Sequence, residues 1–222
     1  MTQDWQQALA DWITTPRLGL ITDVDGTISP IAETPEAASV TDRSRELLAA
    51  LVDKLPLVGV ISGRAAADVQ ARVGVDGVVY MGNHGMERWV NGTVEIPPEV
   101  AVYRPRLEKA ITVLRDEVDG VKGMILEDKG VTLSLHYRRA EDHDAVLRHF
   151  RPLLADIEEV EGLSVFEGRM IFEIRPPVAA NKGTAFRTLV ESYSLDAAVY
   201  VGDDTTDVDA IEAARDLRAA GV

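Results

Sequence analysis

Four short apolar segments recur along the chain, and each is followed directly by polar residues. They are residues 18–22, 56–61, 77–81 and 197–202, all rich in Val, Ile, Leu or Tyr. Their apolar positions are nearly continuous instead of alternating, which predicts strands that are buried on both faces. Strands of this kind are typical of parallel sheets.

Helical patterns separate the first three segments. A helix is expected after Thr41, with its apolar residues between Leu47 and Leu55 on one face. A second helix is expected over residues 65–73, where Gly74 ends it. The order strand, helix, strand, helix, strand predicts the α/β class with a doubly wound parallel sheet.

This alternation stops over residues 86–180, a stretch far longer than the dozen or so residues that a crossover needs. The stretch has apolar patterns of its own, which predict two helices, an alternating strand and a hairpin that turns at Glu167–Gly168. The expected positions are 99–118 and 141–158 for the helices, 131–138 for the strand and 163–176 for the hairpin. We therefore expect a core of residues 1–85 and 181–222, with an inserted α+β domain over 86–180.

The composition limits which classes of partner and which cellular compartment are expected. The 222 residues carry a formal net charge of −14 at pH 7, which argues against nucleic acid and anionic membranes as partners. No stretch approaches the ~18–20 uninterrupted apolar residues of a membrane span. The acidic N-terminus, MTQDWQQALADW, lacks the features of a signal peptide, and the chain has no Cys, so we expect a cytoplasmic protein.

The polar residues that follow the four apolar segments supply the candidate chemistry. Because the carboxyl ends of parallel strands meet at one edge of a sheet, where ligands gather, these residues are expected to converge there. They are Asp23, Asp25, Ser62, Asn83, Asp203 and Asp204. Crowded carboxylates need a cation, and the best match is a magnesium-dependent phosphoryl-transfer site.

The motif DVDGT is the centre of this interpretation. Asp23 and Asp25 are two residues apart at a strand end and are expected to project the same way. One carboxylate can attack phosphorus, and a second can protonate the leaving alkoxide and then deprotonate water. The alternative is an Asp-Gly hairpin turn, but the residues that follow contain two prolines and no strand-like alternation.

The motif GDDTTD supplies further carboxylates. Asp203 is the natural direct metal ligand, with Asp204 and Asp207 bound directly or through water. An EF-hand is the rival interpretation of these spaced acidic residues. It is excluded because Val208 and Ala214 stand where that loop needs Gly and Glu.

Two shorter motifs offer groups for phosphoryl oxygens. In ISGR, Ser62 and Gly63 place a hydroxyl and an amide at a helix start, where anions are favoured. In NKG, Asn181 can cap a helix and Lys182 is a compact cation. Each motif alone is weak evidence, since Ser-Gly is common in loops and a lone Lys is usually solvated.

In this order, DxDGT, a Ser after the second strand, a Lys and GDDxxD resemble the haloacid-dehalogenase-like (HAD) superfamily of phosphatases. The resemblance implies a Rossmannoid core in which Asp23 is the nucleophile and Asp25 the acid/base. It also implies that Ser62 and Lys182 hold the transferring phosphoryl group. Magnesium would be bound by Asp23, the Asp25 carbonyl oxygen and Asp203.

The segments GNHGMER, LEDKGVTLSLHYR and FEGRMIFEIRPPVAANKG are similar to trehalose-6-phosphate phosphatases, in which a cap domain closes over a disaccharide. This resemblance covers nearly the whole chain and implies that polar residues of these segments bind the sugar. They are Asn83, Glu87, Lys129, Arg138, Glu167 and Glu173. For each of them the alternative is the solvated face of an antiparallel sheet. His84 and His136 are expected to be structural residues and not metal ligands.

The implied function is Mg²⁺-dependent hydrolysis of trehalose 6-phosphate to trehalose and phosphate through an aspartyl-phosphate. We expect a monomer that acts on a small-molecule sugar phosphate. One alternative is a phosphatase of the same cap type that acts on sucrose phosphate, mannosyl-phosphoglycerate or a hexose phosphate. Another is a non-enzymatic phospho-accepting signalling domain, although such flavodoxin-like domains need no inserted cap. The chain departs from the family pattern at Val208, where an acidic residue is usual, and ends at Val222, where the family continues into a further strand and helix.

Overall fold

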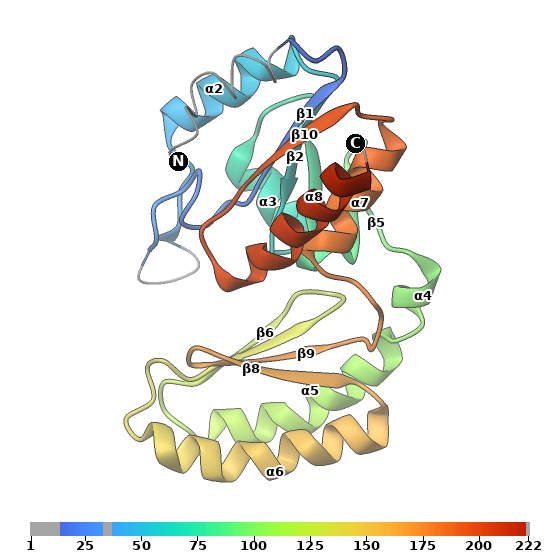
Figure 1. Cartoon of the computed structure of the whole chain (residues 1–222). Helices are drawn as coiled ribbons and strands as arrows, with labels where there is room; N and C mark the ends of the chain where they lie inside the picture. Colours follow the sequence, from blue (N-terminus) through green and yellow to red (C-terminus); the bar gives the residue numbers. More distant parts are fainter. Residues whose placement is uncertain (1–13, 33–36, 221–222) are drawn as a thin grey trace, which may run out of the picture. The chain divides into compact units, whose positions relative to one another are not determined.

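The computed structural model describes residues 14–32 and 37–220 (Figure 1). The chain divides into two compact units. The first unit runs to Glu95 and resumes at Ala180, and the second unit is Ile96–Ala179. The acidic N-terminal segment considered above lies outside the described residues. Among the helices that are described, none combines the length and the apolar character that crossing a bilayer requires.

The sheet of the first unit contains the four predicted strands, β1 (Leu18–Thr22), β2 (Leu57–Ile61), β3 (Val79–Gly82) and β10 (Ala197–Val201). They lie in the order β10-β1-β2-β3, and all three pairs are parallel. Thr22, the last residue of β1, is paired with both Val60 and Val201. The polar residues that follow these strands therefore emerge at one edge, and the predicted α/β class is confirmed.

Two more strands extend this sheet beyond β3, namely β4 (Glu87–Val90) and β5 (Thr93–Glu95). The sequence assigned these residues to the inserted segment, but they pair antiparallel with the sheet of the first unit. Their hairpin turns at Asn91–Gly92, where φ is 49° and 88°. Asn-Gly is the strongest short-range hairpin signal, so this turn could have been predicted.

Helices cover both faces of the sheet. They are α2 (Asp42–Val52), α3 (Ala66–Val73), α7 (Lys182–Ser192) and α8 (Val208–Ala220). Leu48 of α2 shares a buried cluster with Val60 of β2, whereas Phe186 of α7 shares another with Ile61. Successive residues of β2 thus point to opposite helical layers. This double coverage explains why the strand pattern is continuous, and it confirms the doubly wound arrangement.

The second unit is an antiparallel sheet with helices on one face. Its strands lie in the order β6 (Ile125–Asp128), β7 (Leu133–His136), β9 (Ile171–Arg175) and β8 (Ser164–Gly168). Helices α5 (Arg104–Asp119) and α6 (His143–Glu161) contribute Leu114 and Phe150 to a core that also contains Leu135 and Phe172 of the sheet. The expected α+β character is confirmed.

Three local features of this unit differ from the expectation. Strand β6 was not predicted. The single helix expected over 99–118 is divided into α4 (Pro98–Ala101) and α5, because Pro105 in the first turn of α5 cannot donate to a preceding helical carbonyl. The hairpin turns at Arg169–Met170 and not at Glu167–Gly168, which are the last residues of β8. Met170 in this turn adopts the left-handed backbone (φ 63°).

Candidate active site

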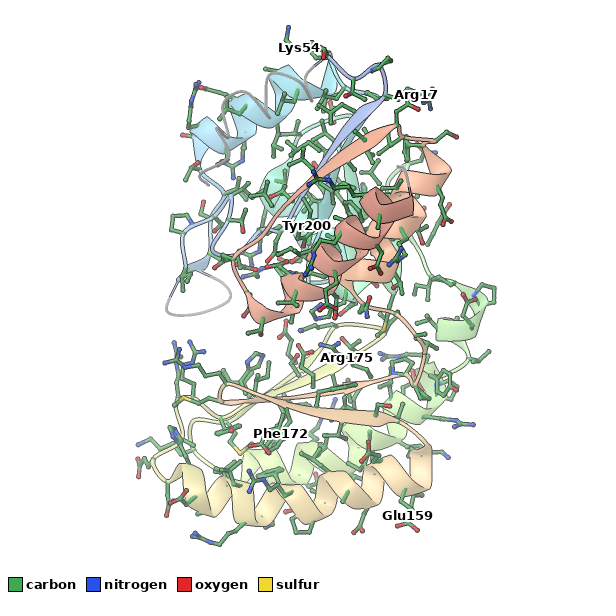
Figure 2. The ribbon with its side chains drawn as sticks, viewed as in Figure 1. Arg17, Lys54, Glu159, Phe172, Arg175 and Tyr200 are labelled. Carbon is green, nitrogen blue, oxygen red and sulfur yellow. The ribbon has the colours of Figure 1, made fainter. Side chains whose placement is uncertain are left out.

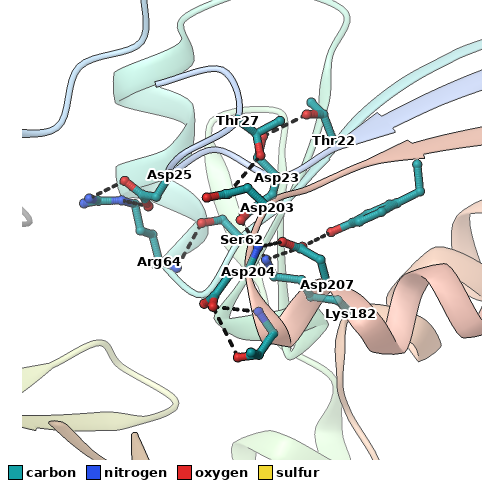
Figure 3. Close-up of polar contacts among 12 residues, drawn as sticks. Thr22, Asp23, Asp25, Thr27, Ser62, Arg64, Lys182, Asp203, Asp204 and Asp207 are labelled. Atoms are coloured by element: carbon teal, nitrogen blue, oxygen red, sulfur yellow. Dashed lines mark hydrogen bonds and ion pairs between the residues drawn. The ribbon is translucent and has the colours of Figure 1, made fainter. Parts of the chain in front are cut away.

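A buried lysine joins two acidic residues at the carboxyl edge of the first sheet (Figure 3). Asp23 directly follows β1, and Lys182 is the first residue of α7, whose N-cap is Asn181. The Lys182 Nζ lies 2.8 Å from Asp23 Oδ2 and 2.7 Å from Asp207 Oδ1. Only 2% of the lysine side chain is exposed. Three buried charges in contact are tolerated because each is paired.

Asp207 is held by contacts to both of its oxygens. Oδ1 accepts hydrogen bonds from Lys182 and, at 2.5 Å, from the Tyr200 hydroxyl, and Oδ2 accepts from the Asp204 amide at 2.9 Å. Burial acts to raise the pKa of Asp207, but these hydrogen bonds outweigh it and hold the pKa below the ordinary value. Asp207 is therefore an ionised anchor that fixes the position of the lysine.

At Asp23 the effect of burial on the pKa outweighs that of the neighbouring charge and hydrogen bond. Burial raises its pKa to about 6, against the lowering effect of the Lys182 charge and hydrogen bond. A carboxylate that burial leaves poorly stabilised gains from any further positive charge beside it. The side chain is thus prepared for a cation or for a reaction that consumes its negative charge.

The carboxylates of Asp23, Asp203 and Asp207 form a group whose oxygens all lie within 4.8 Å of one another. Asp203 is exposed, and its Oδ1 accepts a hydrogen bond from Thr27 at 3.2 Å. Gly26 is required beside it, because a Cβ there would lie 2.0 Å from Asp203 Oδ2 and φ is +85°. An all-oxygen donor set fits a hard cation such as Mg²⁺ or Ca²⁺.

Asp204, which the sequence predicted as a further metal ligand, lies at the start of a short helix. Its carboxylate is the N-cap of the short 3₁₀ helix η3 (Thr205–Asp207) and accepts the Thr205 amide at 2.6 Å. It lies outside the group of three carboxylates. Asp207, expected to bind a metal directly or through water, lies inside that group but has both oxygens engaged.

Asp25 is held by an arginine that the sequence analysis did not single out. Arg64 donates from Nε to Asp25 Oδ2 at 2.6 Å and from Nη2 to Oδ1 at 2.9 Å. Its Nη1 contacts Asp68 at 3.1 Å, which fixes the guanidinium from the other side. Figure 3 shows the Asp25 carboxylate turned toward Arg64 and not toward the pair of Lys182 and Asp23. The two aspartates of DVDGT therefore have different partners.

Ser62 and Gly63 form the loop between β2 and α3. Ser62 is 1% exposed, and its Oγ accepts a hydrogen bond from the Arg64 amide at 3.2 Å. A Cβ at Gly63 would lie 2.8 Å from Nε2 of the buried His84, so a larger residue would displace that ring. The predicted hydroxyl and glycine are thus at the expected edge of the sheet.

Asn83 and Glu87, predicted to bind substrate, are buried beneath this loop. Glu87 is 4% exposed and accepts the amide of Ala66, the first residue of α3, at 2.5 Å. Burial raises the pKa of Glu87, and hydrogen bonds from Ala66 and Asn83 partly offset this. Asn83 is fully buried, and its backbone N–H donates to the Arg64 carbonyl at 2.7 Å. Both residues cap and support the loop, because the N-cap Ala65 has no side-chain acceptor of its own.

The remaining predicted residues belong to the second unit, and they do not share one face. Lys129 Nζ lies 3.6 Å from Glu173 Oε1, and Glu173 also pairs with Arg175. Glu167 is paired in register with the core residue Phe172 and binds Arg151 of α6 through two hydrogen bonds of 2.8 and 3.0 Å.

Glu167 is therefore on the helical side of the sheet, opposite Glu173. In Figure 2 Phe172 lies between the sheet and α6, whereas Arg175 lies on the other side. Arg138, after β7, is exposed, and its carbonyl is 3.4 Å from the His143 ring. His136 contacts Glu127 at 2.9 Å, which agrees with a structural role for this histidine.

The sequence and the fold of this chain are similar to those of known proteins. The sequence model of the trehalose-phosphatase family matches residues 21–222. A trehalose-phosphate phosphatase of Mycobacterium marinum is 35% identical over 218 residues, which cover 95% of this chain and 55% of that protein. Trehalose-phosphate phosphatase B of Arabidopsis thaliana is 30% identical, over 87% of this chain and 55% of its own length. The chain thus spans just over half the length of these curated relatives.

A solved structure shows the shared fold. The C-terminal domain of the trehalose-6-phosphate phosphatase of C. albicans matches 98% of this chain and 80% of its own, with a TM-score of 0.79 and 24% identity. The match spans both units of the chain described above, so the inserted α+β segment is part of the common architecture.

Proposed function

The chain belongs to the trehalose-phosphatase family, and from that premise we propose that it hydrolyses trehalose 6-phosphate to trehalose and inorganic phosphate. The observation that carries the proposal is the buried Asp23 with its raised pKa, in contact with Lys182 and grouped with Asp203. A carboxylate in this setting is suited to attack a phosphoryl group that neighbouring cations hold.

In the first step, an oxygen of Asp23 forms a bond to phosphorus as the bond between phosphorus and the sugar oxygen breaks. Asp25, in its protonated form, gives its proton to that leaving oxygen. In the second step, Asp25 takes a proton from a water molecule, whose oxygen attacks the phosphorus and breaks the bond to Asp23. Phosphate leaves, and both aspartates return to their starting states.

Asp25 must turn from Arg64 toward the substrate to act in this way. Its side chain is 41% exposed, which leaves room for the movement, whereas Arg64 is 14% exposed and braced by Asp68. Arg64 is thus the fixed partner and Asp25 the movable one.

The other residues hold the phosphoryl group and a cation. Lys182, the Ser62 hydroxyl and the Gly63 amide would bind phosphoryl oxygens. Asp23, Asp203 and the Asp25 carbonyl oxygen would hold Mg²⁺, and the oxygen donors of the first two fit this ion. When bound, Mg²⁺ supplies positive charge that stabilises the phosphoryl oxygens in the transition state.

Sugar recognition is assigned to the second unit. Lys129 and Glu173 form a partly covered ion pair on the face of the sheet that α5 and α6 leave open. Such groups donate and accept strong hydrogen bonds to hydroxyls. Arg138 is exposed and stays a candidate for binding the sugar. Glu167, which binds Arg151 on the helical side, serves as a control position.

The proposal is tested by measuring phosphate release from a panel of sugar phosphates with Mg²⁺. We expect steady turnover with trehalose 6-phosphate as the best substrate. A preference for sucrose phosphate, mannosyl-phosphoglycerate or a hexose phosphate would mean that the substrate is a different sugar phosphate and that the reaction is the same. A single stoichiometric phosphorylation without turnover would instead indicate a signalling domain.

The role of the second unit is tested by Glu173→Gln, with Glu167→Gln as its matched control. The loss of one charged hydrogen bond is expected to lower kcat/KM for trehalose 6-phosphate roughly tenfold. The control should change it little. A small aryl phosphate should be hydrolysed equally by both variants, because it has no sugar hydroxyls to bind. Equal losses with both substrates would assign Glu173 to folding.

A further inference from the structure

Within the second unit, whose residues are all described, α5 and α6 pack on only one face of the sheet. Residues directly paired across strands point to the same side. The row that crosses the middle of the open face is Glu127, Ser134, Glu173 and Phe166. Phe166 on the edge strand β8 is therefore the direct neighbour of Glu173, a residue already assigned to sugar recognition.

Phe166 is unusually exposed for a large aromatic residue in a strand. Its exposed fraction is 52%, although Val165, the preceding residue, packs against the core on the other face. The Arg175 guanidinium lies over the ring, with 5.1 Å between its central carbon and the ring centroid. An aromatic ring has two faces, so the arginine orients the ring and occupies one of them.

The side chains around this ring are charged and largely covered. Lys129, Glu173 and Arg175 form a connected ion-paired group, and their side chains are only 11%, 18% and 15% exposed. Single exposed apolar residues are ordinary on protein surfaces. An aromatic ring fixed against a covered group of hydrogen-bond donors and acceptors is a more specific arrangement, typical of binding sites.

This arrangement matches the chemistry of a sugar ring. A pyranose carries hydroxyl groups at its rim and C–H groups on its faces. The face of a benzene ring is electronegative and attracts the weakly positive C–H groups. Ion-paired side chains beside the ring can bind the hydroxyls at the same time. A ring already oriented by Arg175 loses little conformational freedom on binding.

From this juxtaposition we infer that Phe166 is a specificity-determining residue, the platform on which a pyranose ring of the substrate stacks. The inference rests on the proposed function, which it extends from charged residues to an aromatic one. It requires that an aromatic side chain at this position be better than an aliphatic one. It also requires that the effect appear with sugar phosphates and not with small phosphate esters.

The first test compares Phe166→Leu and Phe166→Tyr. The leucine keeps an apolar surface without a π-face, and it is expected to lower kcat/KM for trehalose 6-phosphate at least roughly fivefold. The Phe166→Tyr variant should retain most of the wild-type kcat/KM for trehalose 6-phosphate. Both should hydrolyse an aryl phosphate at the wild-type rate. Val113→Ala, at a position of α5 that is 46% exposed, controls for the loss of a surface apolar group. An unchanged kcat/KM in Phe166→Leu would overturn the inference.

The second test does not depend on turnover. Phe166→Trp is combined with Asp23→Asn, and the fluorescence is followed as trehalose 6-phosphate is added. We expect a saturable change that is absent in Asp23→Asn alone, which retains the three native tryptophans, and that is weakened by adding Glu173→Gln. If the wild-type protein released no phosphate from this ester, the proposed function would fail, and the same titration with trehalose, maltose and sucrose would decide the inference. A saturable response to any of these sugars would support stacking, and no response to the ester or to the sugars would refute it.

Discussion

The ammonium of Lys182 and the carboxylate of Asp23 form a buried ion pair of 2.8 Å, with 2% and 6% of the two side chains exposed. The lysine is held in turn by Asp207 at 2.7 Å. Because Lys182 contacts both Asp23 and Asp207, its positive charge compensates the two buried carboxylates. Both the stability of the fold and the reactivity of Asp23 therefore depend on it.

Lys182→Met is expected to destabilise the protein by about 3–5 kcal/mol, because two buried carboxylates lose their shared cation. The pKa of Asp23 should rise further, since the lysine lowers it, and phosphatase activity should be lost. Chemical denaturation and phosphate release measure the two effects. Adding Asp207→Asn should recover part of the stability and none of the activity. Wild-type stability in Lys182→Met would contradict the pairing.

Asp25→Asn is expected to lower kcat for trehalose 6-phosphate by ~10²–10⁴-fold, the usual contribution of a general acid and base. Formation of the phosphoenzyme from an activated aryl phosphate should be less affected, because its leaving group needs no proton. Rapid-quench measurement of both steps separates them. Arg72→Ala, which removes a contact to Asp68 and leaves Asp25 intact, is the control. If neither substrate were affected, Asp25 would have no acid/base role.

Asp23→Asn is expected to stabilise the metal-free protein. The folded pKa of about 6 lies above the ordinary 3.8, so the native state binds the proton more tightly than the unfolded state. Stability is therefore lost as the pH rises between these values. Because Asn imitates the neutral acid, the variant should gain ~1–3 kcal/mol at pH 8, and the gain should shrink toward pH 4. Urea denaturation in chelator measures it, and a gain independent of pH would refute the assignment.

Removal of divalent metal is expected to abolish turnover, with Mg²⁺ restoring it and Ca²⁺ inhibiting. Ca²⁺ takes 6–8 oxygens in a looser shell, which should let Asp23 bind through both oxygens and lose its attacking geometry. Asp203→Asn should weaken activation by Mg²⁺, whereas Asp204→Asn should act mainly on the local turn. Phosphate release as a function of metal concentration tests this. Full activity in excess chelator would exclude the metal site.

The proximity of Asp23 and Asp203 could be predicted because it depends on large features of the sequence. Continuous apolar segments specify parallel strands buried on both sides, and the ends of such strands meet at one edge. The register of β1 with β10 then brings Asp23 and Asp203 together, whereas Lys182 lies on α7 and its place here was expected only from the resemblance to the family. No side-chain detail is needed for this step.

The faces of short antiparallel strands could not be predicted as well. A turn at Glu167–Gly168 would leave Glu167 outside the strands, but the turn lies two residues later, at Arg169–Met170. Glu167 is therefore part of β8 and lies on the side of the helices, paired with Phe172. The structural role of Glu87 could not be predicted for a different reason. Its carboxylate caps a helix that begins 21 residues earlier, and sequence spacing alone does not reveal such a contact.

We propose that Asp23 carries the phosphoryl group during turnover. The most direct measurement is an acid quench within the first turnovers of trehalose 6-phosphate, followed by mass spectrometry of the peptide that contains Asp23. We predict phosphorylation of Asp23 that accumulates in Asp25→Asn and is absent in Asp23→Asn, whose phosphate release should fall by several orders of magnitude. Turnover without a phosphorylated Asp23, or more than a tenth of wild-type activity in Asp23→Asn, would contradict the account.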